Sequence, residues 1–174
     1  MSPKLPCRPS RRAAPTLPDA LRAARRVAVL GVGSELRGDD VAGVAVARRL
    51  RAWCARTGCR RLAAFDGASA PENLTGEIAR FAPDYLVLVD AAYLGREPGA
   101  VAIVPAESIG GASLSTHTLP VPIILGYLAR TVGCRALVLA IQLEQTEVLA
   151  RPSPAVARAI RRVAGAFERA FGSP

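Results

Sequence analysis

The sequence predicts an α/β protein: a three-layer sandwich in which helices cover both faces of a mostly parallel, twisted sheet of about five strands. Two observations support this prediction. Short apolar runs, typical of the buried strands of a parallel sheet, alternate along the chain with segments of helical periodicity. Several of the runs also end in glycine or aspartate, as in VAVLG and YLVLVD. Because parallel strands end at the same edge of a sheet, we expect these polar ends to meet there.

The first strand and helix set the pattern for the rest of the chain. The apolar run Val27–Leu30 leads into a glycine turn, and the helix that follows has one apolar face. That face consists of Ala42, Val46, Leu50 and Trp53. The remaining predicted strands are residues 61–65, 85–89, 100–104 and 136–141, and the remaining predicted helices are residues 72–81, 123–131 and 154–171. Pro105 closes the strand at 100–104 and favours an edge position for it, with antiparallel pairing.

The basic residues are concentrated at the N-terminus. Residues 1–26 contain seven of the 23 Lys and Arg residues but only one of the 14 Asp and Glu residues, so the rest of the chain carries +3 of the net charge of +9. We therefore expect a basic, largely disordered extension over residues 1–26 and a single α/β domain over residues 27–174. With only 5% aromatic residues and no basic stripe in the body, nucleic-acid binding is not expected as a main function.

The cysteines and the apolar runs indicate where the protein acts. The four cysteines form no CxxC pair, and a single histidine leaves too few ligands for a zinc site of the Cys/His type. Scattered thiols without a disulfide framework are typical of a reducing compartment. No apolar run approaches the roughly 20 residues of a membrane span. We expect a cytoplasmic monomer without membrane association.

Two adjacent carboxylates, Asp39 and Asp40, stand between the first strand and its helix. One interpretation is structural, with Asp39 as a helix cap and both acids facing the helix dipole. Dinucleotide binding is disfavoured because Leu36 occupies the third glycine position of GxGxxG, and two acids would repel a pyrophosphate. Acids at this position suit a cation or a proton-transfer site better than a phosphate.

Further chemistry is suggested by Asp66 and Asp90, which follow two other strands, and by His117, the only imidazole in the chain. Two carboxylates and one imidazole would bind a borderline ion such as nickel or zinc and leave coordination positions open. The structural alternative is that each acid caps a turn. A Ser-His-Asp triad with Ser34 or Ser69 is also conceivable, although no GxSxG motif is present. The spacing of these residues does not decide between the alternatives.

Five short motifs together resemble the hydrogenase maturation endopeptidases, which remove a C-terminal extension from the large subunit of nickel–iron hydrogenases. In chain order they are GVGSELRGDDVAG, DGASAPEN, LVLVDAAYLGREPG, STHTLP and LAIQ, between residues 31 and 142. DGASAPEN and THTLP are most similar to the branch that serves hydrogenases coupled to formate oxidation. The sequence departs from the family pattern at Ser34, where asparagine is usual, at Val41, where glycine often stands, and in its arginine-rich extension.

The resemblance implies roles for individual residues. The family's metal-binding and catalytic positions fall on Asp40, Asp90 and His117, and Asp66 is implied to line the same cleft. The metal would be nickel carried by the substrate, the precursor of a hydrogenase large subunit, rather than a resident cofactor. The resemblance thus implies an endopeptidase of aspartyl type that acts after nickel insertion. The alternatives are an assembly protein that senses nickel without cutting, and a serine hydrolase.

Overall fold

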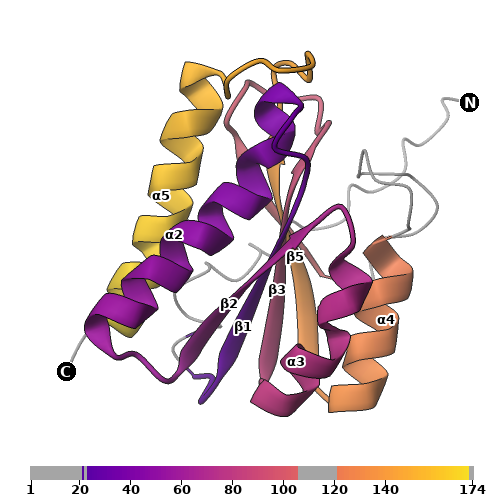
Figure 1. Cartoon of the computed structure of the whole chain (residues 1–174), viewed down its shortest axis with the longest axis vertical. Coiled ribbons are helices and arrows are strands. Elements are labelled where there is room, and N and C mark those ends of the chain that lie inside the picture. The colour runs from indigo at the N-terminus through magenta and orange to yellow at the C-terminus, as the bar shows by residue number, and fades with distance from the viewer. Residues whose placement is uncertain (1–20, 22, 106–120, 173–174) are drawn as a thin grey trace, which may run out of the picture.

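Five strands form one sheet in the order β2-β1-β3-β5-β4 in the computed structural model, which describes residues 21, 23–105 and 121–172 (Figure 1). The strands are β1 (Val27–Val32), β2 (Leu62–Ala68), β3 (Tyr85–Ala92), β4 (Val101–Pro105) and β5 (Arg135–Gln142). The first four strands in this order, β2, β1, β3 and β5, run parallel to one another. The edge strand β4 pairs with β5 in the antiparallel direction. The mostly parallel sheet of five strands and the antiparallel edge strand are confirmed, although β4 runs one residue further than predicted and includes Pro105.

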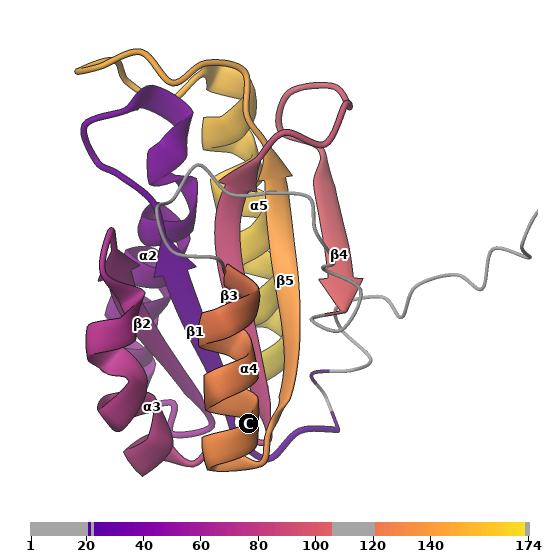
Figure 2. The same ribbon diagram turned by 90° about the vertical axis from the view of Figure 1, so that its right-hand side faces the viewer.

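The helices lie on both faces of this sheet (Figures 1 and 2). They are α2 (Ala42–Thr57), α3 (Thr75–Phe81), α4 (Val121–Val132) and α5 (Pro154–Phe171), with short 3-10 turns η1 (Gly38–Val41) and η2 (Pro71–Leu74). One buried apolar cluster joins alternate strand residues to α2 and α5. The other cluster joins the intervening residues to α3 and α4. This alternation follows from the period of two along each strand, and it confirms the predicted three-layer sandwich.

Local sequence signals explain most element boundaries. Leu50 and Trp53 are buried on α2 as the helical spacing predicts, and Gly58 ends the helix in the left-handed conformation with a φ of 69°. Ser153 caps α5 through its Oγ, which accepts a hydrogen bond from the Val156 amide. The predicted helix over residues 72–81 is wrong in its first turn, because Pro71 opens a 3-10 turn and the α-helix begins only at Thr75.

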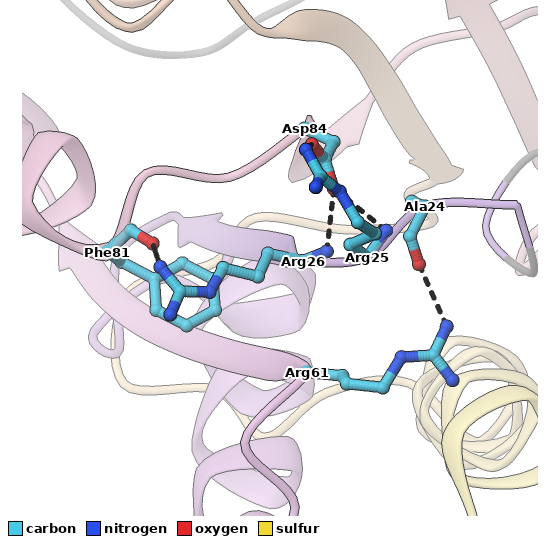
Figure 3. Close-up of polar contacts among 6 residues, drawn as sticks. All are labelled: Ala24, Arg25, Arg26, Arg61, Phe81 and Asp84. Atoms are coloured by element: carbon cyan, nitrogen blue, oxygen red, sulfur yellow. Dashed lines mark hydrogen bonds and ion pairs between the residues drawn. The ribbon is translucent and has the colours of Figure 1, made fainter.

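The last residues of the predicted N-terminal extension are part of the packed body. Leu21 is fully buried in the cluster beneath α2 and α5, and Ala24 is buried beside it. The guanidinium of Arg61, at the start of β2, donates a 2.8 Å hydrogen bond to the carbonyl of Ala24 (Figure 3). Leu21 and Ala24 therefore pack against the body, although both fall within the extension predicted over residues 1–26. The predicted disorder of residues 1–20 falls outside the described residues.

An aspartate then fixes this segment at the amino ends of the strands. The amides of Arg25 and Arg26 donate hydrogen bonds of 2.8 and 2.9 Å to one oxygen of Asp84, directly before β3 (Figure 3). The guanidinium of Arg26 reaches the carbonyl of Phe81 and lies over that residue's ring. These bonds hold the pKa of Asp84 below its usual range, chiefly because the charged carboxylate accepts the Arg26 amide.

Within the part of the chain that the structure describes, no helix is both long and apolar enough to cross a membrane.

Candidate functional site

The winding of the sheet changes direction between β1 and β3. The chain passes from β1 to β2 on one side and then returns to β3 on the other side of β1. In α/β sheets of this kind, ligands bind at the carboxyl ends of the strands beside such a switch point. Gly31 on β1 is aligned with Val89 on β3, so Asp90 follows at this point. The fold thus places one of the predicted site residues where a ligand site is expected.

Two glycines bring the start of α2 against these strand ends. A Cβ atom on Gly43 would lie 2.1 Å from the carbonyl oxygen of Val89, and one on Gly31 would lie 2.1 Å from the carbonyl oxygen of Gly43. Only residues without a side chain permit so close an approach of two backbones. As a consequence η1, which carries Asp39 and Asp40 and directly precedes α2, contacts β3.

Asp40 and Asp90 are both buried at this edge. The Ser34 amide, in the loop after β1, donates a 3.0 Å hydrogen bond to Oδ2 of Asp40. Gly33 has a φ of 141°, and a Cβ atom there would lie 1.8 Å from the carbonyl oxygen of Asp40. The loop therefore wraps closely around Asp40 and fixes its position. Asp90 sits on a central strand, aligned with Ala140 of β5. The structure thus brings these two predicted site residues to one edge.

Asp39 has a different and structural role. Its Oδ2 accepts hydrogen bonds from the amides of Glu144 and Gln145, at 2.7 and 3.0 Å, and its Oδ1 accepts one of 2.6 Å from the amide of Ser153. The residue is fully buried, and these three donors balance the desolvation of its charge. Asp39 holds the loop between β5 and α5. The interpretation of Asp39 as a helix cap is wrong, because neither η1 nor α2 has a side-chain cap.

Asp66 is held by an arginine from α2. The guanidinium of Arg48 donates to Oδ2 of Asp66 at 2.5 Å and to Oε1 of Glu35. Pairing with Arg48 lowers the pKa of Glu35, and the two carboxylates raise the pKa of Arg48. Arg48 therefore joins the loop after β1 to the end of β2. No hydrogen-bond donor among the described residues reaches the buried Oδ1 of Asp66.

The strand register separates Asp66 from Asp90. Asp66 is aligned with Gly31 and through it with Val89, so these three residues point to the face covered by α2. Asp90 is the next residue after Val89 and points to the opposite face, which α3 and α4 cover. A cleft containing both carboxylates would have to reach around the end of β1. Asp66 stands at the same edge but is separated by one strand from the position of Asp90.

Gln142 and Arg48 are two site residues that the sequence did not single out. Gln142 is buried at the end of β5, where its Oε1 accepts the amides of Leu94 and Arg96 and its Nε2 donates to the carbonyl of Leu143. It fixes the loop after β3 that begins just beyond Asp90. A polar residue at the end of the apolar run LVLAIQ was a usable signal for Gln142. Arg48 had none, because it resembles the other exposed arginines of its helix.

The third predicted ligand, His117, lies outside the described residues. Among the described residues, no group of three or more His, Cys, Asp or Glu side chains is placed to hold a metal ion. The predicted triad of Asp40, Asp90 and His117 therefore stays a prediction. The hydroxyl of Ser34, the alternative nucleophile, accepts a 3.3 Å hydrogen bond from the amide of Leu36, which is a local turn contact.

The chain is an α/β protein with two buried carboxylates near its topological switch point, the position at which such sheets bind ligands. A family model described as hydrogenase maturation protease matches residues 44–170. The hydrogenase 3 maturation protease of Escherichia coli K12 is 32% identical over 106 residues, covering 60% of this chain and 65% of that protein. A protein of Methanocaldococcus jannaschii assigned as a hydrogenase maturation protease is 28% identical over 128 residues, 71% of this chain and 76% of that protein.

Solved structures agree with these matches. The crystal structure of a [NiFe] hydrogenase maturation protease, HycI, from Thermococcus kodakarensis KOD1 superposes with a TM-score of 0.83 at 29% identity, covering 90% of this chain and 99% of that one. The chain belongs to the hydrogenase maturation protease family. It is therefore a peptide-bond hydrolase of hydrogenase maturation, as the five motifs predicted.

Proposed function

We propose that this protease removes the C-terminal extension of a nickel–iron hydrogenase large-subunit precursor after nickel has been inserted. The observation that carries the proposal is the pair of buried carboxylates, Asp40 and Asp90, at the switch point of a chain of this family. The precursor is the partner that membership of the family implies. Specificity for the nickel-loaded form is the further step that the experiment below must establish.

In this proposal the nickel belongs to the substrate. Asp40, Asp90 and His117 would offer at most three oxygen and nitrogen donors, which is a weak set for holding an ion permanently. A nickel held by the thiolates of the partner could accept these side chains at its vacant positions. The contact would orient the two proteins and place the scissile peptide bond at the carboxyl edge. Processing would then report that insertion has taken place.

Two routes of attack on the peptide bond fit these residues. A water molecule could be activated by the nickel of the substrate, or Asp40 could act as the general base, and both could contribute. The Ser34 amide holds one oxygen of Asp40 in the loop after β1. An aspartyl-type endopeptidase would use a carboxylate in this way, as the general base.

We also propose that the enzyme is a cytoplasmic monomer.

The test is to mix the purified enzyme with precursor prepared without nickel and with precursor loaded with nickel, and to follow both by mass spectrometry. Release of a short C-terminal fragment from the loaded form alone is expected. Ser34→Ala is the control and should keep this activity, because its hydroxyl only accepts the Leu36 amide. Efficient cutting of the metal-free form would remove the nickel requirement and the role of His117. Loss of cleavage in Ser34→Ala, with the protein folded, would favour the serine hydrolase.

A further inference from the structure

Two loops meet at the carboxyl edge and form a firm ridge. The loop after β1 and the loop between β5 and α5 lie side by side (Figure 2). Leu149 donates its amide to the carbonyl of Leu36 at 2.7 Å, and Arg37 and Val148 form an isolated antiparallel bridge. Three adjacent aliphatic residues of this ridge, Leu36, Val148 and Leu149, are here called the apolar rim.

The apolar rim is exposed to solvent. The residue exposures are 61% for Leu36, 67% for Val148 and 79% for Leu149. A single exposed leucine on a protein surface is ordinary, but three large aliphatic residues joined by backbone contacts form a patch. Such patches are typical of surfaces that bind another protein. None of the three side chains is needed to fill the two buried clusters.

The fold holds the rim in this exposed arrangement at an energetic cost. Leu149 has a φ of 63°, a left-handed conformation that a leucine rarely adopts. Its loop is fixed by the fully buried carboxylate of Asp39, which accepts three backbone amides from residues 144, 145 and 153. A buried charge and a strained residue together keep apolar side chains in water. This combination indicates that the position of the rim serves binding rather than stability.

We propose that the apolar rim is a docking surface for the hydrogenase large-subunit precursor, and that it receives an apolar segment of that protein beside its scissile bond. The inference rests on the proposed function. Its main support is continuity with the catalytic edge, since Leu36 is two residues from Ser34, whose amide binds Asp40. A folded protein whose peptide bond reaches Asp40 and Asp90 must pass over the neighbouring loops, and the rim is the apolar part of them.

Charge on the ridge also favours an apolar contact over an ionic one. Glu35 is already paired with Arg48. The exposed charges of the two loops are Glu35, Glu144 and Glu147 against Arg37 and Arg151, so they sum to −1, and Glu35 shares Arg48 with Asp66. A ridge with a net charge of only −1 offers little general attraction to an acidic or basic partner. We therefore expect the rim to bind the precursor by burying apolar surface rather than through ion pairs.

The test uses Leu149→Asn, a substitution that suits the backbone. Asparagine tolerates the left-handed conformation better than leucine, so the variant should fold with an unchanged or higher thermal midpoint. For peptide release from nickel-loaded precursor, we expect KM to rise about tenfold and kcat to stay unchanged. The substitution removes apolar surface from the contact with the precursor but does not change the residues proposed to cut the peptide bond. Leu36→Gln should act in the same direction. Tyr127→Gln, at a residue of α4 that is 49% exposed, is the control and should leave KM unchanged.

A wild-type KM in both rim variants would overturn the docking surface while leaving the proposed function intact. If the wild-type enzyme releases no peptide, the proposed function fails, and binding of the loaded precursor measured by titration then decides on the rim. Weaker binding by Leu149→Asn supports it, and equal binding overturns it. Sedimentation tests whether a second copy of this chain occupies the rim instead. If the wild-type protein is a dimer that Leu149→Asn dissociates, and precursor binding is unchanged, the rim is a dimer contact and the proposed docking surface is wrong.

Discussion

At each end of the sheet an aspartate accepts backbone amides of a distant segment, but the two aspartates differ in burial. At the carboxyl edge, Asp39 accepts the amides of Glu144, Gln145 and Ser153. At the amino edge, Asp84 accepts the amides of Arg25 and Arg26 (Figure 3). In both cases a carboxylate fastens a segment that is distant in sequence. Asp39 is fully buried, however, whereas the side chain of Asp84 is 37% exposed.

This difference is consistent with the proposal that catalysis takes place at the carboxyl edge. A fully buried carboxylate has to be satisfied by the protein alone, and at the carboxyl edge Asp39 does this for the loops. Its neighbour Asp40 can therefore serve chemistry without being the residue that holds them together. The amino edge offers no such division of labour, because Asp84 is engaged with the backbone of its own anchored segment.

The largest effect is expected for Asp39→Ala. The substitution leaves three backbone amides without their acceptor in a buried loop contact, which should lower the free energy of unfolding by about 3–5 kcal/mol. The measurement is urea denaturation followed by circular dichroism. A loss near the roughly 1 kcal/mol of a helix cap would show that water replaces Asp39 and that the loop contact is not buried in solution.

At the amino edge, Leu21→Ala should have the next largest effect. Leu21 is fully buried with α2 and α5, so its truncation leaves a cavity and should cost about 3 kcal/mol. The control is a chain that begins near residue 18 and keeps Leu21, which should retain the thermal midpoint of the full chain. If that shorter chain melts several degrees lower, residues before Leu21 also contribute to packing.

Asp84→Asn should be milder and should depend on pH. The pKa of Asp84 is lowered in the folded protein, so its contribution to stability is complete above the pKa of the unfolded chain, about 3.9. It is lost as the pH falls through the still lower folded value. The variant should therefore melt below wild type at pH 7, and the two proteins should converge once the pH has fallen below the folded pKa of Asp84. A difference that is constant across this range would mean that the charge of Asp84 contributes nothing to the anchor.

Local sequence patterns predicted the strands, the edge position of β4 and most helices, because apolar periodicity and turn-forming residues depend on neighbouring positions in the chain. They failed for Asp39, whose partners lie 105 to 114 positions later and are backbone amides, which leave no trace in the side-chain pattern. They also failed for Leu21, which lies in a short segment rich in alanine and arginine. The position of Asp66 and Asp90 at one edge of the sheet was predictable from parallel strand ends. The contribution of His117 stays a prediction.

Asp40→Asn should have the smallest effect on stability and the largest on activity. Asparagine keeps an oxygen that can accept the Ser34 amide, so the loop after β1 should remain closed and the thermal midpoint should stay near that of wild type. The variant loses the negative charge, which in the proposed mechanism removes both the general base and a ligand for the nickel of the substrate. Its release of peptide from nickel-loaded precursor should fall below detection, while Asp39→Ala, assayed at a temperature where it remains folded, should retain part of the activity.

If both variants are folded and lose cleavage equally, the division between a structural Asp39 and a catalytic Asp40 is wrong. If Asp40→Asn cleaves normally, Asp40 is not the base, and the attack on the peptide bond must depend on the nickel of the substrate alone.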